Sequence, residues 1–139
     1  MHPNEKAFRA ALDLFNEREY EAASMYFAED SVWHYPCRNP LQGVYHGRAG
    51  LIDFFTRLYE MSGGAVQADT VHILADDNHV VRIARIHFEP GGKLVEWMGA
   101  SVCNVGPDGL VTESWIYEDD VEVAKIFEAM AHGGSPPPE

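Results

Sequence analysis

The alternation of apolar and polar residues is clearest in the second half of the chain, where four runs rich in Val, Ile and aromatic residues follow one another. The breaks between the runs contain Gly, Pro, Asn and Asp and are too short for a crossover connection, so they join antiparallel neighbours. The pattern predicts a four-stranded antiparallel meander with strands at Val66–Leu74, His79–Glu89, Lys93–Val105 and Leu110–Asp119.

Helical periodicity marks the first half of the chain. A first helix is predicted over Ala7–Glu17, with Asn4 as a candidate N-cap, and a short second helix over Tyr20–Phe27. A third helix from Arg48 to Met61 carries a wide apolar stripe and is ended by Ser62–Gly64, since glycine accepts the left-handed capping conformation.

The remaining segments complete an α+β pattern. A short strand is predicted at Asp30–Pro36, followed by a Pro- and Gly-containing loop at Asn39–Gly47. A last helix is expected from Asp120 to Ala131, and residues 132–139 are expected to form a disordered tail. This order predicts one domain, residues 1–131, in which three N-terminal helices pack against a cone-shaped, strongly curved sheet. The open end of such a cone is a natural small-molecule pocket.

Composition narrows the choice of partners. The 139 residues include 22 Asp and Glu but only 10 Lys and Arg, and the formal charge of −12 would repel nucleic acid and anionic membrane surfaces. The chain has neither a bilayer-length apolar run nor a signal-peptide pattern, so we expect a cytoplasmic protein whose Cys37 and Cys103 are thiols. The histidines lack metal-ligand spacing, and no glycine-rich phosphate loop follows a strand; we therefore expect no metal and no nucleotide cofactor.

Several motifs resemble the SnoaL-like branch of the nuclear-transport-factor-like superfamily, which also contains ketosteroid isomerases, limonene epoxide hydrolases and scytalone dehydratases. The matching segments are Asp30–Pro36, Asn39–Arg48, Leu51–Leu58, Ala75–Val81 and Glu113–Asp120. The resemblance implies a cone fold, an apolar small-molecule ligand, and a homodimer formed through the outer face of the sheet. It does not choose an activity, because the superfamily hosts several chemistries.

Two of those chemistries need carboxylates that are absent from the corresponding positions of this chain. The general-base aspartate of ketosteroid isomerases corresponds to Tyr35, or to His34 if the strand is shifted by one residue. The Arg-x-Asp of limonene epoxide hydrolases becomes Arg85-Ile86-His87, and Tyr117 stands near their second aspartate. Both mechanisms are therefore disfavoured, unless His87 serves as the base.

SnoaL-type polyketide cyclases move a proton next to a carbonyl so that an intramolecular aldol closes a ring. By resemblance, the acid/base candidates are His34, His87 and Asp120, and an imidazole titrates near neutral pH. Tyr35 or Tyr117 would donate to the enolate oxygen. The alternatives are packed or surface histidines and an Asp120 that caps the last helix.

The predicted binding residues are mainly aromatic and suit a flat, apolar ligand: Trp33, Tyr35, Phe54, Arg85, Trp97, Trp115 and Tyr117. Strand alternation leaves open which face of the sheet lines the pocket. Three functions remain: cofactor-independent acid/base catalysis on a polycyclic or polyketide-like carbonyl compound, non-catalytic binding or carriage of an apolar molecule, and a dimerisation module with a filled pocket.

Overall fold

The structure is a computed structural model that describes residues 1–89, 92–119 and 125. Its elements are α1 (Pro3–Asn16), α2 (Tyr20–Ser24), β1 (Phe27–Tyr35), β2 (Gly43–His46), α3 (Gly47–Met61), β3 (Gln67–Ala75), β4 (His79–Phe88), β5 (Val95–Val105) and β6 (Val111–Glu118). The helix predicted over Asp120–Ala131 and the tail 132–139 lie outside the described residues.

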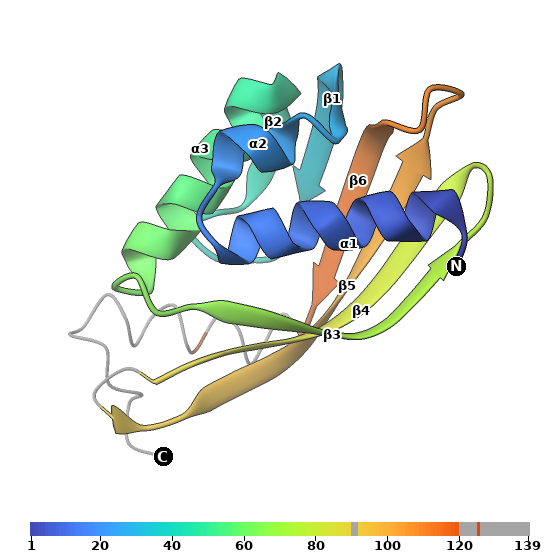
Figure 1. The fold of residues 1–139 in the computed structure, drawn as a ribbon. Helices are drawn as coiled ribbons and strands as arrows, with labels where there is room; N and C mark the ends of the chain where they lie inside the picture. Colours follow the sequence, from blue (N-terminus) through green and yellow to red (C-terminus); the bar gives the residue numbers. More distant parts are fainter. Residues whose placement is uncertain (90–91, 120–124, 126–139) are drawn as a thin grey trace.

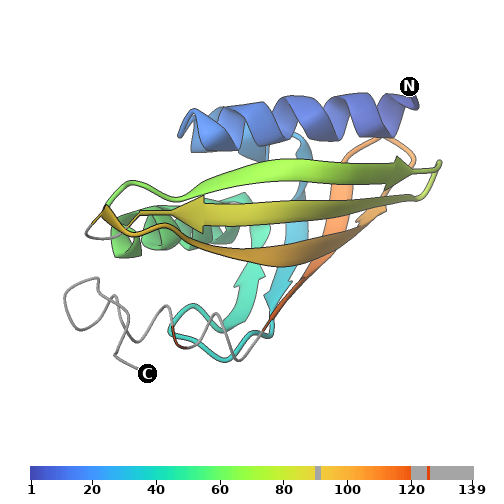
Figure 2. The same cartoon turned by 90° about the horizontal axis from the view of Figure 1, so that it is seen from below.

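The strands form one six-stranded sheet in the order β2-β1-β6-β5-β4-β3. Strands β3 to β6 pair antiparallel with their sequence neighbours, which confirms the predicted meander. Strand β1 joins the sheet parallel to β6, so the sheet is mixed. Figures 1 and 2 show the three helices gathered on one side of this curved sheet, which confirms the α+β cone.

Three local predictions were wrong in detail. Within the predicted loop, Gly43–His46 forms strand β2, because these residues pair antiparallel with the end of β1. The second helix ends at Ser24, and Phe27 is the first residue of β1 instead of the last residue of a helix. The N-cap of α1 is His2, since Pro3 fits the first helical turn, where no backbone N–H is needed.

Burial decides which face of the sheet points inward. In β4, Val80, Arg82, Ala84 and Phe88 are buried, whereas Ile83 between them is exposed. Because successive side chains of a strand point to opposite faces, the buried set marks the concave face, which packs against the helices. Strand alternation alone left open which face of the sheet lines the pocket, and this difference in exposure identifies that face.

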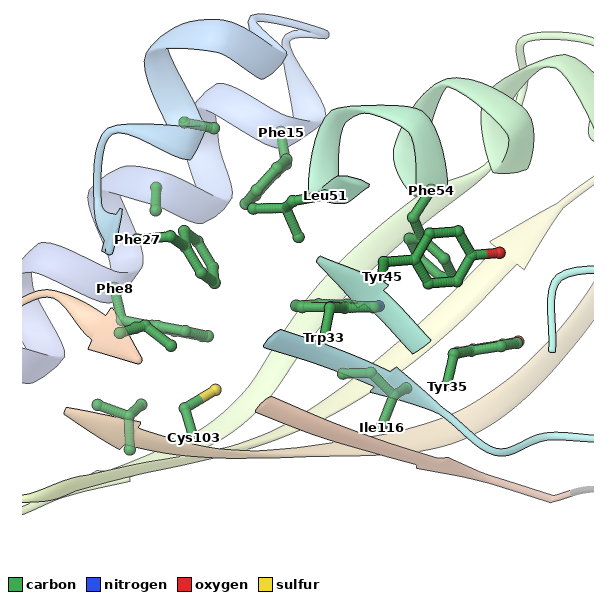
Figure 3. Close-up of a cluster of buried hydrophobic side chains, with 14 of the residues drawn as sticks. Phe8, Phe15, Phe27, Trp33, Tyr35, Tyr45, Leu51, Phe54, Cys103 and Ile116 are labelled. Atoms are coloured by element: carbon green, nitrogen blue, oxygen red, sulfur yellow. The ribbon is translucent and has the colours of Figure 1, made fainter. Parts of the chain in front are cut away.

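Aromatic side chains fill much of the space between the sheet and the helices. Figure 3 shows Trp33 and Tyr35 on β1 and Ile116 on β6 facing Phe15 of α1 and Leu51 of α3. All five side chains are buried. The core therefore packs α1 and α3 against strands β1 and β6.

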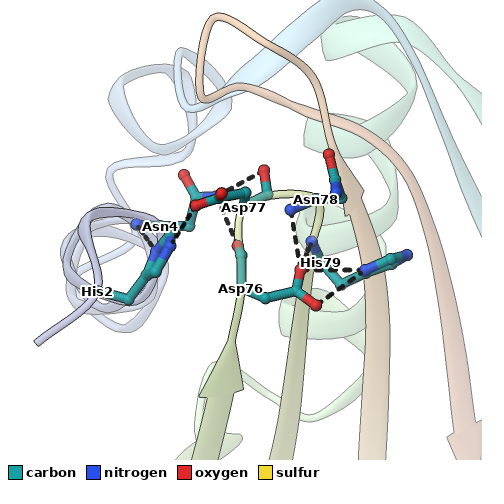
Figure 4. A network of polar contacts seen from close by, with 6 residues as sticks. All are labelled: His2, Asn4, Asp76, Asp77, Asn78 and His79. Atoms are coloured by element: carbon teal, nitrogen blue, oxygen red, sulfur yellow. Dashed lines mark hydrogen bonds and ion pairs between the residues drawn. The ribbon is translucent and has the colours of Figure 1, made fainter.

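A polar network fastens the start of α1 to the turn between β3 and β4 (Figure 4). The His2 Nδ1 atom accepts a hydrogen bond from the Asn4 backbone N–H, and His2 Nε2 lies 2.9 Å from Asp77 Oδ1. The Asn4 side-chain amide donates to the Asp76 carbonyl oxygen at 2.9 Å. The turn itself is held by Asp76 Oδ1, which accepts from the backbone N–H groups of Asn78 and His79.

These turn contacts predict a pH-dependent effect of Asp76→Ala. The hydrogen bond from Asn78 is the largest cause that lowers the pKa of Asp76. A carboxyl with a lowered pKa stabilises the fold above its ordinary pKa of about 3.9, and that contribution is lost as the pH falls through the lowered value. We expect Asp76→Ala to lower the Tm at pH 7 and the difference from wild type to shrink below about pH 4.

Thermal melts at pH 7 and pH 3 check this prediction. The control is Asp13→Ala, because the exposed Asp13 carboxylate accepts no hydrogen bond from the described residues. A difference between Asp76→Ala and wild type that stays constant from pH 7 to pH 3 would contradict the role given to the carboxylate.

Candidate functional site

A cavity of about 110 Å³ lies between the concave face of the sheet and the helices. A cavity of roughly 150 Å³ accommodates benzene, so this space suits a ligand of about one ring. Most of its walls are apolar or aromatic side chains from α1, α3 and the strands. Within the part of the chain that the structure describes, the charged and amide side chains of the wall are Asn16, Arg18, Gln67, Arg82 and Glu118.

The Glu118 carboxylate lies in the wall at the end of β6, and two described side chains donate hydrogen bonds to it. The Tyr35 hydroxyl donates to Glu118 Oε2 at 3.1 Å, and the Trp97 indole Nε1–H donates to the same oxygen at 3.0 Å. The Asn39 side-chain amide donates to the Tyr35 oxygen at 3.1 Å. Strands β1, β5 and β6 thus bring a carboxylate and its donors to one end of the cavity.

A glycine on the neighbouring strand makes room for this carboxylate. Gly99 of β5 pairs with Glu118, and a Cβ added at Gly99 would lie 3.3 Å from Glu118 Cγ and 3.0 Å from Ile86 Cδ1. Such contacts are tighter than ordinary packing, so a larger residue would displace the Glu118 side chain. Gly99 therefore allows the carboxylate to lie across the sheet.

Tyr35 acts in this cluster as a neutral hydrogen-bond donor. Burial raises the pKa of its hydroxyl, and the nearby Glu118 carboxylate raises it further. The phenol therefore keeps its proton throughout the neutral range. Its role in the geometry is to orient the carboxylate, while Asn39 orients the phenol.

A second charged group, Arg82, is buried in the wall at 9% exposure. Its Nε donates to Thr70 Oγ1 at 3.0 Å, and Nη2 donates to the Ala68 carbonyl oxygen at 3.3 Å. Burial lowers the pKa of Arg82 to about 10, and the Asp69 carboxylate partly opposes that shift. The guanidinium therefore still carries its charge at neutral pH.

One donor in the wall lacks an acceptor. The Trp33 indole Nε1 is buried and makes no hydrogen bond with any described residue. Leaving a buried donor unpaired costs about 1–3 kcal/mol.

The structure divides the predicted site residues between two faces. Four of the predicted binding residues, all aromatic, line the cavity: Trp33, Tyr35, Phe54 and Trp97. Five of the predicted catalytic and binding residues are absent from its lining and project from the opposite face of the sheet: His34, Arg85, His87, Trp115 and Tyr117. Asp120 lies outside the described residues.

The residues on the outer face form contacts of their own. His34 Nε2 lies 2.6 Å from Glu113 Oε2, and its ring stacks on Trp115 with 5.2 Å between the ring centroids. Arg85 and His87 both contact Asp69 Oδ2, at 3.2 and 2.8 Å. These contacts do not bring the two histidines to the cavity, so their catalytic roles stay predictions.

Sequence reasoning missed Glu118 and Arg82. The signal for Arg82 was its parity, because it shares a strand face with Val80, Ala84 and Phe88. Glu118 is two residues from the buried Ile116 and therefore lies on the same face of β6. Neither signal identifies a site until the inward face is known.

The described residues also give no evidence of a metal site, a disulfide or a membrane-spanning helix. Within residues 1–89, 92–119 and 125, no group of three His, Cys, Asp or Glu side chains could hold a metal ion. The thiols of Cys37 and Cys103 are buried and not joined in a disulfide. In the same part of the chain, every helix is too short or too polar to cross a membrane.

Comparison with known proteins agrees with this architecture. The SnoaL-like domain family matches residues 8–114, so the chain belongs to the SnoaL-like family. Its fold is that of the nuclear-transport-factor-like superfamily, as predicted. A comparison with curated proteins gives no match.

Three solved structures illustrate the similarity. Bal32a, from a soil-derived mobile gene cassette, is 26% identical, with 95% of this chain and 96% of that chain covered and a TM-score of 0.76. TerC, co-crystallised with polyporic acid, is 21% identical over 91% of this chain and 99% of its own, with a TM-score of 0.80. The epoxide hydrolase/cyclase-like enzyme SalBIII, described in pyran ring formation in the polyether salinomycin, is 15% identical over 86% and 92% of the chains, with a TM-score of 0.69.

Proposed function

We propose that the cavity binds a compact, largely apolar carbonyl compound and that Glu118 moves a proton on it without a cofactor. The observation that carries this proposal is a carboxylate held inside an apolar wall by the Tyr35 hydroxyl and the Trp97 indole. A positioned carboxylate in a site with few polar competitors is suited to general-base catalysis.

The reaction needs only these groups and the substrate. The Glu118 carboxylate takes a proton from the carbon next to the carbonyl, and the electron pair moves to the carbonyl oxygen to form an enolate. Glu118 then returns the proton to another carbon, which completes an isomerisation. Alternatively, the enolate carbon attacks a second carbonyl of the same molecule, and the proton goes to the new alkoxide, which completes a cyclisation.

Two proteins with a similar fold are consistent with a small-molecule site, but they do not identify the substrate of this chain. SalBIII is described as an epoxide hydrolase/cyclase-like enzyme, and TerC was co-crystallised with polyporic acid, but both likenesses extend to the fold alone. For this chain, the Glu118 cluster and the one-ring size of the cavity favour a small cyclic ketone or diketone over a large polycyclic compound.

Solvent deuterium exchange tests the proposal without knowledge of the product. Cyclic ketones such as 1-indanone and cyclohexanone are incubated with the protein in D₂O, and loss of the proton signal next to the carbonyl is followed by NMR. We expect faster exchange with the folded protein than with buffer or heat-denatured protein. A rate equal to that of buffer for every ketone that binds would contradict the proposal.

The second candidate is a protein that binds or carries an apolar molecule unchanged. It is favoured by the mainly apolar and aromatic lining of the cavity, which suits an apolar molecule without any proton transfer. Extraction of co-purified ligand and mass spectrometry separate the two candidates. A bound compound that is recovered unchanged after prolonged incubation, with no deuterium incorporated, would support the carrier.

We also propose that a second copy of the chain covers the outer face of the sheet. Ile83, Met98 and Tyr117 are exposed there by 36%, 47% and 52%, and the registers place Ile83, Ala100 and Tyr117 side by side. Figures 1 and 2 show the described helices on the opposite, concave side of the sheet, so they leave this face open. A patch of exposed apolar side chains of this kind is typical of an interface between subunits.

Ile83→Asp is the variant that tests this interface. We expect it to shift the protein from dimer to monomer in light scattering after size exclusion, because a carboxylate would be buried against the partner copy. The control is Val44→Asp on β2, where an exposed apolar side chain lies away from the central strands. A monomeric wild type, or an unchanged dimer in Ile83→Asp, would contradict the proposal.

A further inference from the structure

The buried arginine in the cavity wall makes no ion pair with a carboxylate among the described residues. The Asp69 carboxylate acts on Arg82 electrostatically but is itself paired with Arg85 and His87. Arg82 is 9% exposed, and its hydrogen bonds go to a hydroxyl and a carbonyl oxygen, both uncharged. Removing a charge from water costs several kcal/mol unless an opposite charge offsets it. A charge kept at this cost in the wall of a candidate site points to a ligand that supplies the missing negative charge.

The charge balance of the cavity differs from that of the whole chain. Among the described residues, its lining contains two arginines, Arg18 and Arg82, and one carboxylate, Glu118, so these side chains sum to one excess positive charge, whereas the whole chain carries −12. Arg18 is already engaged, because it donates to the Val66 carbonyl and its guanidinium lies 4.1 Å from the centre of the Tyr59 ring. Arg82 is therefore the cation that best suits an anionic ligand group.

The strand register places Arg82 and Glu118 on the concave face, two strands apart and offset by two residues along the strand direction. Arg82 pairs with Ser101, which pairs with Ile116, while Glu118 pairs with Gly99. Two strand spacings and one two-residue step separate the backbones of Arg82 and Glu118 by about 12 Å. Both side chains line the same cavity, so a ligand of one ring has room to meet the cation at one end and the carboxylate at the other.

We propose that the ligand of this cavity carries an anionic oxygen that pairs with Arg82, either a carboxylate or the enolate of a 1,3-dicarbonyl compound. The assignment of the reacting end to Glu118 rests on the proposed function, whereas the pairing with Arg82 does not. The cavity thus selects cyclic, ring-sized acids over their neutral analogues.

Calorimetric titration with matched pairs of compounds tests this selection. The carboxylate pair is benzoate and benzamide; the enolate pair is 1,3-cyclohexanedione, an acidic diketone, and its neutral methyl enol ether. For the wild-type protein at pH 7.5, we expect at least one anion to bind tenfold or more tightly than its neutral partner. The pair that shows the preference identifies the source of the anionic oxygen.

Arg82→Met links the preference to the arginine. We expect this variant to lose the preference, with a 10- to 100-fold weaker affinity for the anion and little change for the neutral compound. The variant should fold, because a linear apolar side chain replaces a buried charge, and Arg82→Lys retains the charge in a second variant. Arg9→Met is the control, since Arg9 lies on α1, pairs with Glu5 and is not part of the cavity wall.

Three results would overturn the inference: no binding of either anion, equal affinity of each anion and its neutral partner, or an anion preference that persists in Arg82→Met. The wild-type comparison alone suffices if both Arg82 variants fail to fold. The proposed function fails separately, through absence of deuterium exchange at a bound ketone. An anion preference without exchange would keep the pairing with Arg82 and remove the catalytic role of Glu118.

Discussion

Glu118→Gln is expected to lower the protein-dependent rate of deuterium exchange by about 10²- to 10⁴-fold, the usual contribution of a positioned general base. Glutamine keeps nearly the same shape, and its carbonyl oxygen can still accept hydrogen bonds from the Tyr35 hydroxyl and the Trp97 indole. It cannot take a proton from carbon. The variant should therefore bind ligand with little change in affinity but lose exchange.

Glu113→Gln is the matched control for this experiment. Glu113 lies on the same strand, β6, but on the outer face, where it contacts His34. We expect Glu113→Gln to exchange ketone protons at the wild-type rate. Exchange that survives Glu118→Gln within a factor of about three, in a protein with an unchanged Tm, would remove Glu118 as the base.

Phe54→Ala is expected to lower the free energy of unfolding by about 3–5 kcal/mol, the usual cost of removing a buried aromatic ring. Phe54 is 3% exposed, and its ring lies within 4.9–5.4 Å, centroid to centroid, of Trp33, Tyr35 and Tyr45. The Phe55 ring is a fourth neighbour, at 5.2 Å, so removing the Phe54 ring takes one packing partner from each of four aromatic side chains. The change also enlarges the cavity, because Phe54 belongs to its wall.

Urea denaturation measures the loss, and Leu74→Ala is the control. Leu74 is 69% exposed on β3, so its truncation should change the free energy of unfolding by less than about 0.5 kcal/mol. A loss below about 1 kcal/mol in Phe54→Ala would mean that the aromatic cluster is loosely packed and that the wall of the cavity is not fixed by it.

The fold was largely predictable because its strongest signals are local. The meander follows from short turns rich in Gly, Pro, Asn and Asp between β-forming runs, and the apolar stripe of α3 is wide. Strand β2 was missed because its four residues, Gly43–His46, follow a loop-like segment and form a strand only through pairing with β1. That pairing is a tertiary contact, and local composition does not encode it.

The candidate site was only half predictable because two adjacent residues of a strand cannot share a face. His34 stands between Trp33 and Tyr35 on β1, so once those two aromatic side chains point into the cavity, His34 must point away from it. The motif resemblance drew attention to all three residues together. Exposure, which only the folded sheet reveals, separates them.

Arg82 and Glu118 were hidden for a related reason. Both faces of the sheet carry apolar residues, for example Ala84 on the concave face and Ile83 on the outer one. Neither face could therefore be assigned to solvent from the sequence. A charged residue on either face can be assigned to a cavity only when it is known which face the helices cover.

The most direct test of the account is an NMR titration of the three tryptophan indole N–H signals, assigned with single Trp→Phe variants. Trp33 and Trp97 line the cavity, whereas Trp115 lies on the outer face against His34. With cyclic ketones, benzoate and 1,3-cyclohexanedione, we expect saturable shifts of the Trp33 and Trp97 signals and a constant Trp115 signal. Shifts confined to Trp115 would contradict this expectation and would place the ligand on the outer face of the sheet.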